Sequence, residues 1–251
     1  MRVLTLNTWQ EYGTWRERWE VIDAFIREAS PDVIFFQEIF SRKWASDTAA
    51  RLGYEECLSH DEPAGLVMLT RFRVLEAGLL SYHSKSPAEK RDRYIQHVWL
   101  ETPDAGDFLA INTHLSWRPS DHGIRYRQAG ELIQAVEILS EDGPVICAGD
   151  FNCDVDTSEI DLIKSRGRFR DCYAVHQPYE RGWTWSHKNP YTALPSNLIG
   201  GELMPQRRID YIFCRPPRGF PFQSKSCRIV LDQPDSRGIW ASDHFGLLAE
   251  F

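Results

Sequence analysis

Short apolar runs alternate with amphipathic segments along the chain, which predicts strands mixed with helices. Residues 3–6 and 32–36 are predicted strands, and the second is apolar enough to be buried on both faces. Between them, apolar residues recur at helical spacing over residues 15–29, behind a capping-box pattern at Thr14 and Glu17. Ser30 and Pro31 end this helix, and a second helix is predicted over residues 41–52.

The same pattern continues to the C-terminus. A third helix is predicted over residues 122–140, and residues 84–93 form a charged, exposed linker. Residues 178–206 are rich in Pro, Gly, Trp and Asn and are predicted to form long loops. Further strands are predicted near residues 66–70, 74–82, 94–101, 108–113, 145–148, 209–213, 226–231 and 245–250.

No repeat, low-complexity tract or interdomain linker divides the 251 residues. We therefore expect one domain over residues 1–251, with a layered α/β or α+β architecture in which sheets lie inside and helices outside. The composition, 42% hydrophobic and 26% charged, is that of an ordinary globular protein.

The net charge of −7 disfavours binding to long duplex DNA, which usually needs a basic face, but leaves room for a local basic cleft. The six cysteines form no CxxC pair, so we expect buried free thiols rather than disulfides or a zinc site. No signal-peptide pattern and no apolar run of roughly 18 residues is present. We expect a cytoplasmic monomer without a membrane span.

Polar residues gather at the ends of the predicted strands. Taken singly, several have simple explanations: Asn and Asp are common turn residues, a lone histidine is usually structural, and Asp210 could pair with Arg207 or Arg208. Glu38 is harder to dismiss, because a carboxylate beside a core needs a partner. The whole group provides four carboxylates, two amides and two histidines: Asn7, Glu38, His114, Asp150, Asn152, Asp210, Asp243 and His244.

These side chains suit a hard cation and a phosphate. Carboxylate and amide oxygens are the ligands that Mg²⁺ prefers, and imidazoles can donate to phosphate oxygens. The sequence has no HExxH zinc motif, no Walker loop and no GxGxxG. A Ser242–Asp243–His244 triad is disfavoured because GxSxG is absent and adjacent strand residues point to opposite faces. In the segment AGDFN, Asp150 and Asn152 are two apart and share a face.

Six segments in order resemble the endonuclease/exonuclease/phosphatase superfamily, the deoxyribonuclease I-like fold. They are LTLNTW at Asn7, DVIFFQE at Glu38, NTHL at His114, AGDFN, RRIDYIF at Asp210 and SDH at residues 242–244. The resemblance covers nearly the whole chain. It implies a four-layer α/β/β/α sandwich of two packed mixed sheets flanked by helices, with the polar strand ends converging at one rim.

The resemblance also implies a role for each residue. Glu38 and Asn7 would bind Mg²⁺ or Mn²⁺, and Asp150 would orient and deprotonate the attacking water. Asn152 would hold the phosphate or the nucleophile, and His114 and His244 would stabilise the phosphoryl oxygens. Asp210 would orient His114, and Asp243 would support His244 or the metal.

The expected activity is metal-dependent hydrolysis of a phosphodiester by an activated water, with two alternatives: a phosphomonoesterase for a small metabolite, or an inactive binding module of this fold. The motifs depart from the apurinic-endonuclease and inositol-phosphatase patterns, and NTW inverts the TWN start of tyrosyl-DNA phosphodiesterase-like members, so no branch is assigned.

We expect a compact substrate: a short nucleic acid end, a nucleotide adduct or a lipid headgroup. In this fold, loops that carry Trp117, Arg118 and Trp183 would border the rim and contact that substrate. For Trp183 the alternative is that it only fastens a long loop to the sandwich.

Overall fold

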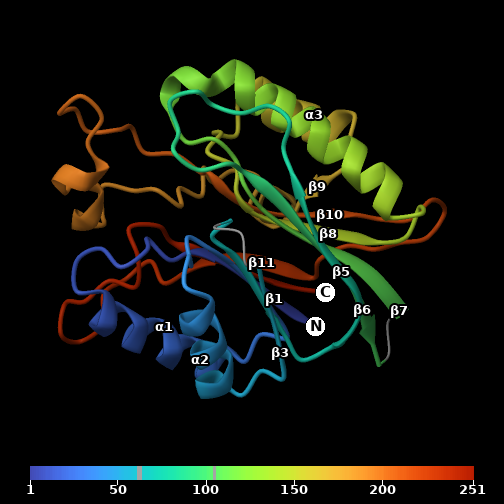
Figure 1. The fold of residues 1–251 in the computed structure, drawn as a ribbon, viewed down its shortest axis with the longest axis horizontal. Helices are drawn as coiled ribbons and strands as arrows, with labels where there is room; N and C mark the ends of the chain where they lie inside the picture. The colour runs from blue at the N-terminus through green and yellow to red at the C-terminus, as the bar shows by residue number, and fades with distance from the viewer. Residues whose placement is uncertain (61–63, 104–105) are drawn as a thin grey trace.

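Two six-stranded mixed β-sheets pack face to face in the computed structural model, and helices cover both outer faces (Figure 1). The structure describes residues 1–60, 64–103 and 106–251. This is the four-layer α/β/β/α sandwich that the family resemblance implied. Within the described residues, no helix is both long and apolar enough to cross a membrane.

The first sheet contains both termini in adjacent strands, and the Met1 ammonium donates to the Phe251 carbonyl at 3.0 Å. Only β1 and β2 pair in parallel, and the other neighbours are antiparallel. The strand order is β11 (Ser226–Val230), β12 (Gly246–Glu250), β1 (Arg2–Asn7), β2 (Val33–Gln37), β4 (Leu66–Thr70) and β3 (Glu56–Ser59).

The second sheet likewise has one parallel pair, β7 with β8, among antiparallel neighbours. Its order is β5 (Arg73–Ser81), β6 (Tyr94–Thr102), β7 (Gly106–His114), β8 (Val145–Asp150), β10 (Asp210–Arg215) and β9 (Arg170–Asp171).

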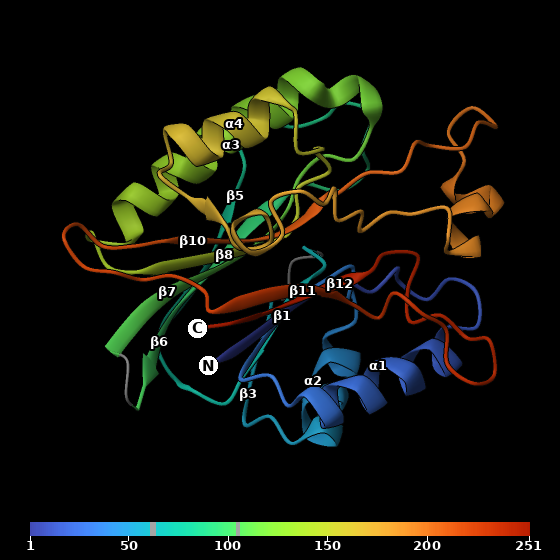
Figure 2. The same ribbon diagram turned by 180° about the vertical axis from the view of Figure 1, so that it is seen from behind.

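The helices form the outer layers, as the front and back views show (Figures 1 and 2). Helices α1 (Trp15–Ala29) and α2 (Arg42–Leu52) pack their apolar faces on the first sheet. Helices α3 (His122–Leu139) and α4 (Ser158–Ser165) cover the second sheet. The short helix α5 (Cys172–His176) lies beside β10 and β11, and three 3₁₀ turns complete the helical elements: Pro119–Asp121, Pro190–Ala193 and Pro195–Asn197.

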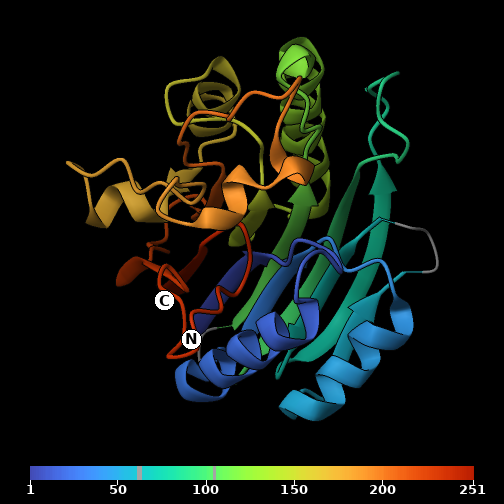
Figure 3. The ribbon, with the colours of Figure 1, turned by 90° about the vertical axis from the view of Figure 1, so that its left-hand side faces the viewer.

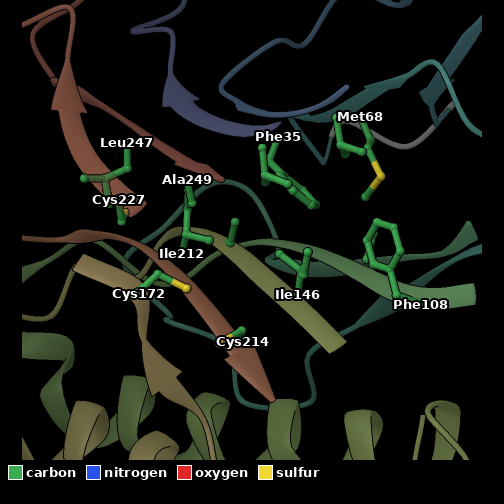
Figure 4. Packing of buried hydrophobic residues seen from close by; sticks show 14 of the residues in the cluster. Phe35, Met68, Phe108, Ile146, Cys172, Ile212, Cys214, Cys227, Leu247 and Ala249 are labelled. Carbon is green, nitrogen blue, oxygen red and sulfur yellow. The ribbon is translucent and has the colours of Figure 1, made fainter. Parts of the chain in front are cut away.

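The central core lies between the two sheets (Figure 4). Phe35 and Met68 of the first sheet are fully buried, as is Ile146 of the second, while Phe108 is 2% exposed. Burying side chains of this size contributes roughly 1.5–3 kcal/mol each. Five of the six free cysteines are buried and Cys57 is half-buried, as expected for thiols that form no disulfide.

Buried amides also cross between the sheets. Gln37 of β2 donates through Nε2 to Oδ1 of Asn112 on β7 at 2.9 Å, and Asn112 Nδ2 donates to Gln96 Oε1 on β6 at 3.1 Å. Asn112 Nδ2 also lies 3.0 Å from the Phe36 carbonyl of the first sheet. These amides fix the position of one sheet on the other, because their hydrogen bonds are directional.

The two parallel pairs bring the polar residues to one rim. The carboxyl ends of β1, β2, β7 and β8 carry Asn7, Glu38, His114 and Asp150. Because β10 is antiparallel to β8, its first residue Asp210 pairs with Asp150, and His114 lies opposite Asp150 on the other side. Figure 3 views the molecule from the end at which the 190–206 segment projects.

Each strand and helix predicted from the sequence is present, with ends that agree within two residues. The predicted capping box is wrong, because the Thr14 side chain makes no cap hydrogen bond and Thr14 is not extended. Four short elements were not predicted: β3, β9, α4 and α5. They are two to eight residues long, too short for a periodic apolar pattern to emerge.

Gly149 of β8 is required by its surroundings. Its φ is +144°, and a Cβ would lie 1.9 Å from the Thr113 carbonyl oxygen of β7. Gly149→Ala should therefore lower the free energy of unfolding by more than about 3 kcal/mol in urea titrations, through a clash next to Asp150. Gly238→Ala is the control: its φ is +80° but no described atom lies within 4 Å, so only about 1 kcal/mol should be lost. Equal losses in the two variants would contradict the clash.

Candidate active site

A cavity of about 520 Å³ opens at this rim. Its size suits a ligand of roughly nucleotide dimensions. It is bordered by the 88–93 segment, by the 196–199 segment and by residues that the sequence had singled out: Asn7, Glu38, His114, Trp117, Arg118, Asp150, Asn152, Asp243 and His244. Seven of the eight polar strand-end residues therefore converge, and Asp210, fully buried, lies behind His244.

Asp150 is the centre of the hydrogen-bonding network. Its Oδ2 accepts from Asn7 Nδ2 at 3.0 Å, a bond between the two sheets, and its Oδ1 accepts from the backbone NH of Asn152 at 2.9 Å. His114 Nε2 lies 3.4 Å and His244 Nε2 3.9 Å from Oδ2. One carboxylate is thus surrounded by an amide and two imidazoles.

Asp210 pairs with His244. Oδ2 of Asp210 accepts from His244 Nδ1 at 2.9 Å, which directs Nε2 of that ring toward Asp150. The Trp185 ring packs edge-on against the His244 imidazole, at a centroid distance of 5.0 Å, and helps to hold that imidazole in place. The prediction that Asp210 orients His114 is therefore wrong. The strand order places Asp210 beside β8 and its side chain reaches the turn before β12 instead.

The two histidines differ in charge. Burial by itself lowers the pKa of His244, but the charges of Asp210, Asp243 and Asp150 outweigh it and raise that pKa to about 10. Burial, assisted by the charges of Arg93 and His244, holds the pKa of His114 well below its usual value. At neutral pH the His244 imidazole is charged and the His114 imidazole is neutral.

The carboxylates crowd one another. Burial, reinforced by Asp210, raises the pKa of Asp150 to about 7. Burial raises the pKa of Asp243 to about 6, lowered in part by His244 and raised by Glu38. Asp243 accepts hydrogen bonds from Ser242 Oγ at 3.2 Å and Asn197 Nδ2 at 3.0 Å. This accumulation of negative charge favours a bound cation.

The residues fit a divalent cation. Asp150, Asp210 and His244 offer three ligand atoms within 4.8 Å of one another. His244 Nδ1 already donates to Asp210, however. Carboxylate oxygens without a hydrogen-bond partner among the described residues, such as those of Glu38, are therefore better candidates for metal ligands. Glu38 has a left-handed φ of +67°, and no described residue hydrogen-bonds to its carboxylate. Holding a glutamate in that conformation costs about 1–2 kcal/mol, which is typical of a functional position.

Arg18 was not identified from the sequence. It is fully buried, and its guanidinium donates to carbonyls on both sides of the site, to Thr8 at 2.8 Å and Ala241 at 3.0 Å. It also donates to three carbonyls of the turn after β1, those of Trp9, Gln10 and Tyr12. Arg18 thereby links the turn after Asn7 to the turn before Asp243.

The prediction that Trp183 borders the rim and contacts the substrate needs a correction. Trp183 is 41% exposed and does not border the cavity, whereas Trp185, two residues later, is 7% exposed and borders it. Residues 88–93, expected to be an exposed linker, also border it. Their charges were visible in the sequence, but their position depends on the turn between β5 and β6.

The contribution of the charged His244 to the stability of the fold can be measured as a function of pH. Its raised pKa means that its pairing stabilises the fold fully below pH 6.5, and that this contribution is lost as the pH rises toward 10. In chelator, the difference in melting temperature between wild type and Asp210→Asn should be largest near pH 6 and shrink by pH 9–10. A difference that stayed constant with pH would show that His244 is not charged in the fold.

The fold resembles several solved structures. TDP2 from D. rerio complexed with a single-strand DNA product is 18% identical, with a TM-score of 0.79 over 99% of this chain and 97% of that chain. Truncated TDP2 from Caenorhabditis elegans is 16% identical, with a TM-score of 0.79 over 99% and 96%. The endonuclease/exonuclease/phosphatase from Bacteroides vulgatus is 19% identical, with a TM-score of 0.77 over 99% and 97%. At these identities the likeness concerns the fold.

A comparison with curated proteins found no match. The family assignment rests on the sequence profile instead. Residues 4–244, from the first strand to His244, match the profile of the Endonuclease/Exonuclease/phosphatase family. The chain belongs to that family.

Proposed function

We propose that the protein is a divalent-metal-dependent phosphodiesterase that hydrolyses its substrate by in-line attack of water. The observation that supports this most is the arrangement around Asp150: one charged imidazole, one neutral imidazole and an amide lie beside this carboxylate in one cavity, and Asp210 lies behind His244. Membership of a family of phosphoester hydrolases supports the reaction class.

Asp150 is the proposed general base. It is held by Asn7 and by the backbone of Asn152, and a water placed beside its carboxylate would transfer a proton to it during attack. With a pKa raised to about 7, this carboxylate is a stronger base than an ordinary aspartate and still ionises near neutral pH.

The charged His244 offsets the negative charge that develops on the phosphoryl oxygens. Asp210 fixes its tautomer and keeps it protonated, so that the Nε2 proton points into the cavity. The neutral His114 can donate one further hydrogen bond. Asn152 Nδ2 is oriented by its bond to the Leu115 carbonyl at 3.1 Å, and its second hydrogen can bind a substrate oxygen.

Glu38 and Asn7 are the proposed ligands of Mg²⁺ or Mn²⁺, with Asp243 beside them. When bound, the cation supplies positive charge that stabilises the phosphoryl group in the transition state. Hard oxygen ligands favour these ions over softer metals.

The proposed substrate is compact: a short nucleic acid end, a nucleotide adduct or a lipid headgroup. The single-strand DNA product in the similar D. rerio TDP2 structure favours the nucleic acid end. The net charge of −7 speaks against long duplex DNA. Trp117, 40% exposed, and Arg118 border the cavity and are proposed to contact the substrate.

The metal requirement is tested first. Hydrolysis of bis-p-nitrophenyl phosphate should disappear in excess chelator and return with Mg²⁺ or Mn²⁺, because the crowded carboxylates otherwise repel the substrate phosphate. p-Nitrophenyl phosphate serves as the comparison, and faster turnover of this monoester would favour the phosphomonoesterase alternative. Full diesterase activity in a metal-stripped sample would refute metal dependence, and no turnover of any phosphoester would favour an inactive binding module.

Substitutions test the individual roles. Asp150→Asn, His244→Ala and Glu38→Ala should each lower kcat at least about a hundredfold, as expected for the loss of a base or of a charge stabiliser. Asp156→Asn, a 74% exposed carboxylate, is the control and should keep wild-type activity. Circular dichroism would verify folding, and near-normal kcat in any folded variant would remove that residue from the mechanism.

A further inference from the structure

Arg207 is a half-buried cation whose side chain has no hydrogen-bond or ion-pair partner among the residues that the structure describes. It is the first residue of the RRIDYIF motif that carries Asp210, and it borders the catalytic cavity. Its Nε is buried with no hydrogen-bond partner, and no described carboxylate forms an ion pair with its guanidinium. Burial lowers the pKa of Arg207 and the charge of Asp150 raises it, so the guanidinium lies within electrostatic reach of the proposed base.

Other arginines near the cavity have hydrogen-bond and ion-pair partners within the protein. Arg208 donates through Nη1 to both oxygens of Asp171, at 2.7 and 2.9 Å. Arg125 donates to two carbonyls and lies 3.7 Å from Glu159. A buried cation normally has such a partner, since desolvation without one is costly. Nε is buried without a partner in all three arginines, but only in Arg207 does no other guanidinium nitrogen bond to a described group.

Arg118 borders the same cavity and shares this feature. Its Nε is buried without a partner, and its guanidinium packs over the Trp117 ring at 4.9 Å from the centroid. No described carboxylate forms an ion pair with Arg118. Among the arginines that border the cavity, Arg207 and Arg118 each combine a buried, unpartnered Nε with the lack of an ion pair to a described carboxylate. A guanidinium fork suits phosphate oxygens in particular.

We infer that Arg207 and Arg118 form a subsite for a second phosphate of the substrate, adjacent to the phosphodiester that is cleaved. The inference rests on the proposed phosphodiesterase function and narrows its substrate class. It selects nucleotides and strand ends with two phosphates over a lipid headgroup with a single phosphodiester, because the latter would leave the buried Nε of Arg207 and its guanidinium charge without a partner.

Two chromogenic esters that differ by one phosphate test the subsite. They are thymidine 5′-p-nitrophenyl phosphate and the same compound with a 3′-phosphate. Arg207→Met should raise KM for the second ester by about 10- to 100-fold, the usual effect of removing a charged hydrogen bond, and Arg118→Met should act in the same direction. Arg207→Met should change KM for the first ester less than about threefold.

Controls separate this effect from general electrostatics. Arg207→Lys keeps the charge but not the fork and should show an intermediate KM. Arg218→Met removes an arginine that is 75% exposed and should change neither ester. Equal losses for both esters in Arg207→Met would place Arg207 at the cleaved phosphate and overturn the inference, as would no loss for either.

Binding without turnover keeps the inference independent of the reaction. In isothermal titration calorimetry with chelator present, wild-type protein should bind thymidine 3′,5′-bisphosphate more tightly than thymidine 5′-monophosphate, and Arg207→Met should abolish the preference. A preserved preference in Arg207→Met refutes the subsite. An inactive protein that still shows the Arg207-dependent preference would refute the proposed function while upholding the subsite.

Discussion

The site depends on the position of one sheet relative to the other. Asn7 belongs to the first sheet and Asp150 to the second, and the 3.0 Å hydrogen bond between them exists only if the two rims meet in register. Apolar packing does not by itself fix such a register, because dispersion contacts have little directionality. The amides of Gln37 and Asn112, buried between the sheets, provide the missing directionality. Each hydrogen bond contributes only about 1 kcal/mol net, but a misplaced sheet would leave both amides unsatisfied.

Charge balance at the rim depends on cations that the fold supplies. Glu38, Asp150 and Asp243 lie near one another, and the charged His244 offsets part of their repulsion. Arg18 contributes a second positive charge, although burial lowers its pKa to about 10. Its five carbonyl acceptors compensate its desolvation without neutralising its charge. The positive charge can therefore act on the carboxylates while the guanidinium stays in place, an arrangement that also holds the turns beside Asn7 and Asp243.

Local signals in the sequence predicted a layered fold and the polar residues at the strand ends, and the family resemblance implied that these residues converge at one rim. Buried strands are apolar runs, and the polar residue that ends each run stands out against it. Partnerships across the sheets leave no such signal. Nothing in the sequence around Asp210 indicates which histidine it pairs with, and only the strand order assigns it to His244. Arg18 lies between Trp15 and Trp19 on a helix, where an arginine is normally solvent-exposed. Trp183 and Trp185 are two residues apart, so an extended segment would place both on the same face. The antiparallel backbone bridge between Trp185 and Arg207 holds Trp185 at the cavity.

The bridge between Trp185 and Arg207 also bears on how an acidic protein would hold the proposed anionic substrate. The Trp185 ring packs against His244, and Arg207, whose backbone pairs with that of Trp185, borders the same cavity. One short antiparallel contact therefore places an aromatic ring and a cation side by side. The net charge of −7 averages over the whole surface, whereas a ligand in the cavity responds to charges within a Debye length of about 8 Å at physiological ionic strength. In the proposed function, Glu38 and Asp243 on the first-sheet side would attract a cation, and Arg118 and Arg207 on the second-sheet side would attract phosphate. Because these opposite charges lie in different parts of one cavity, the proposed ligands would not displace each other.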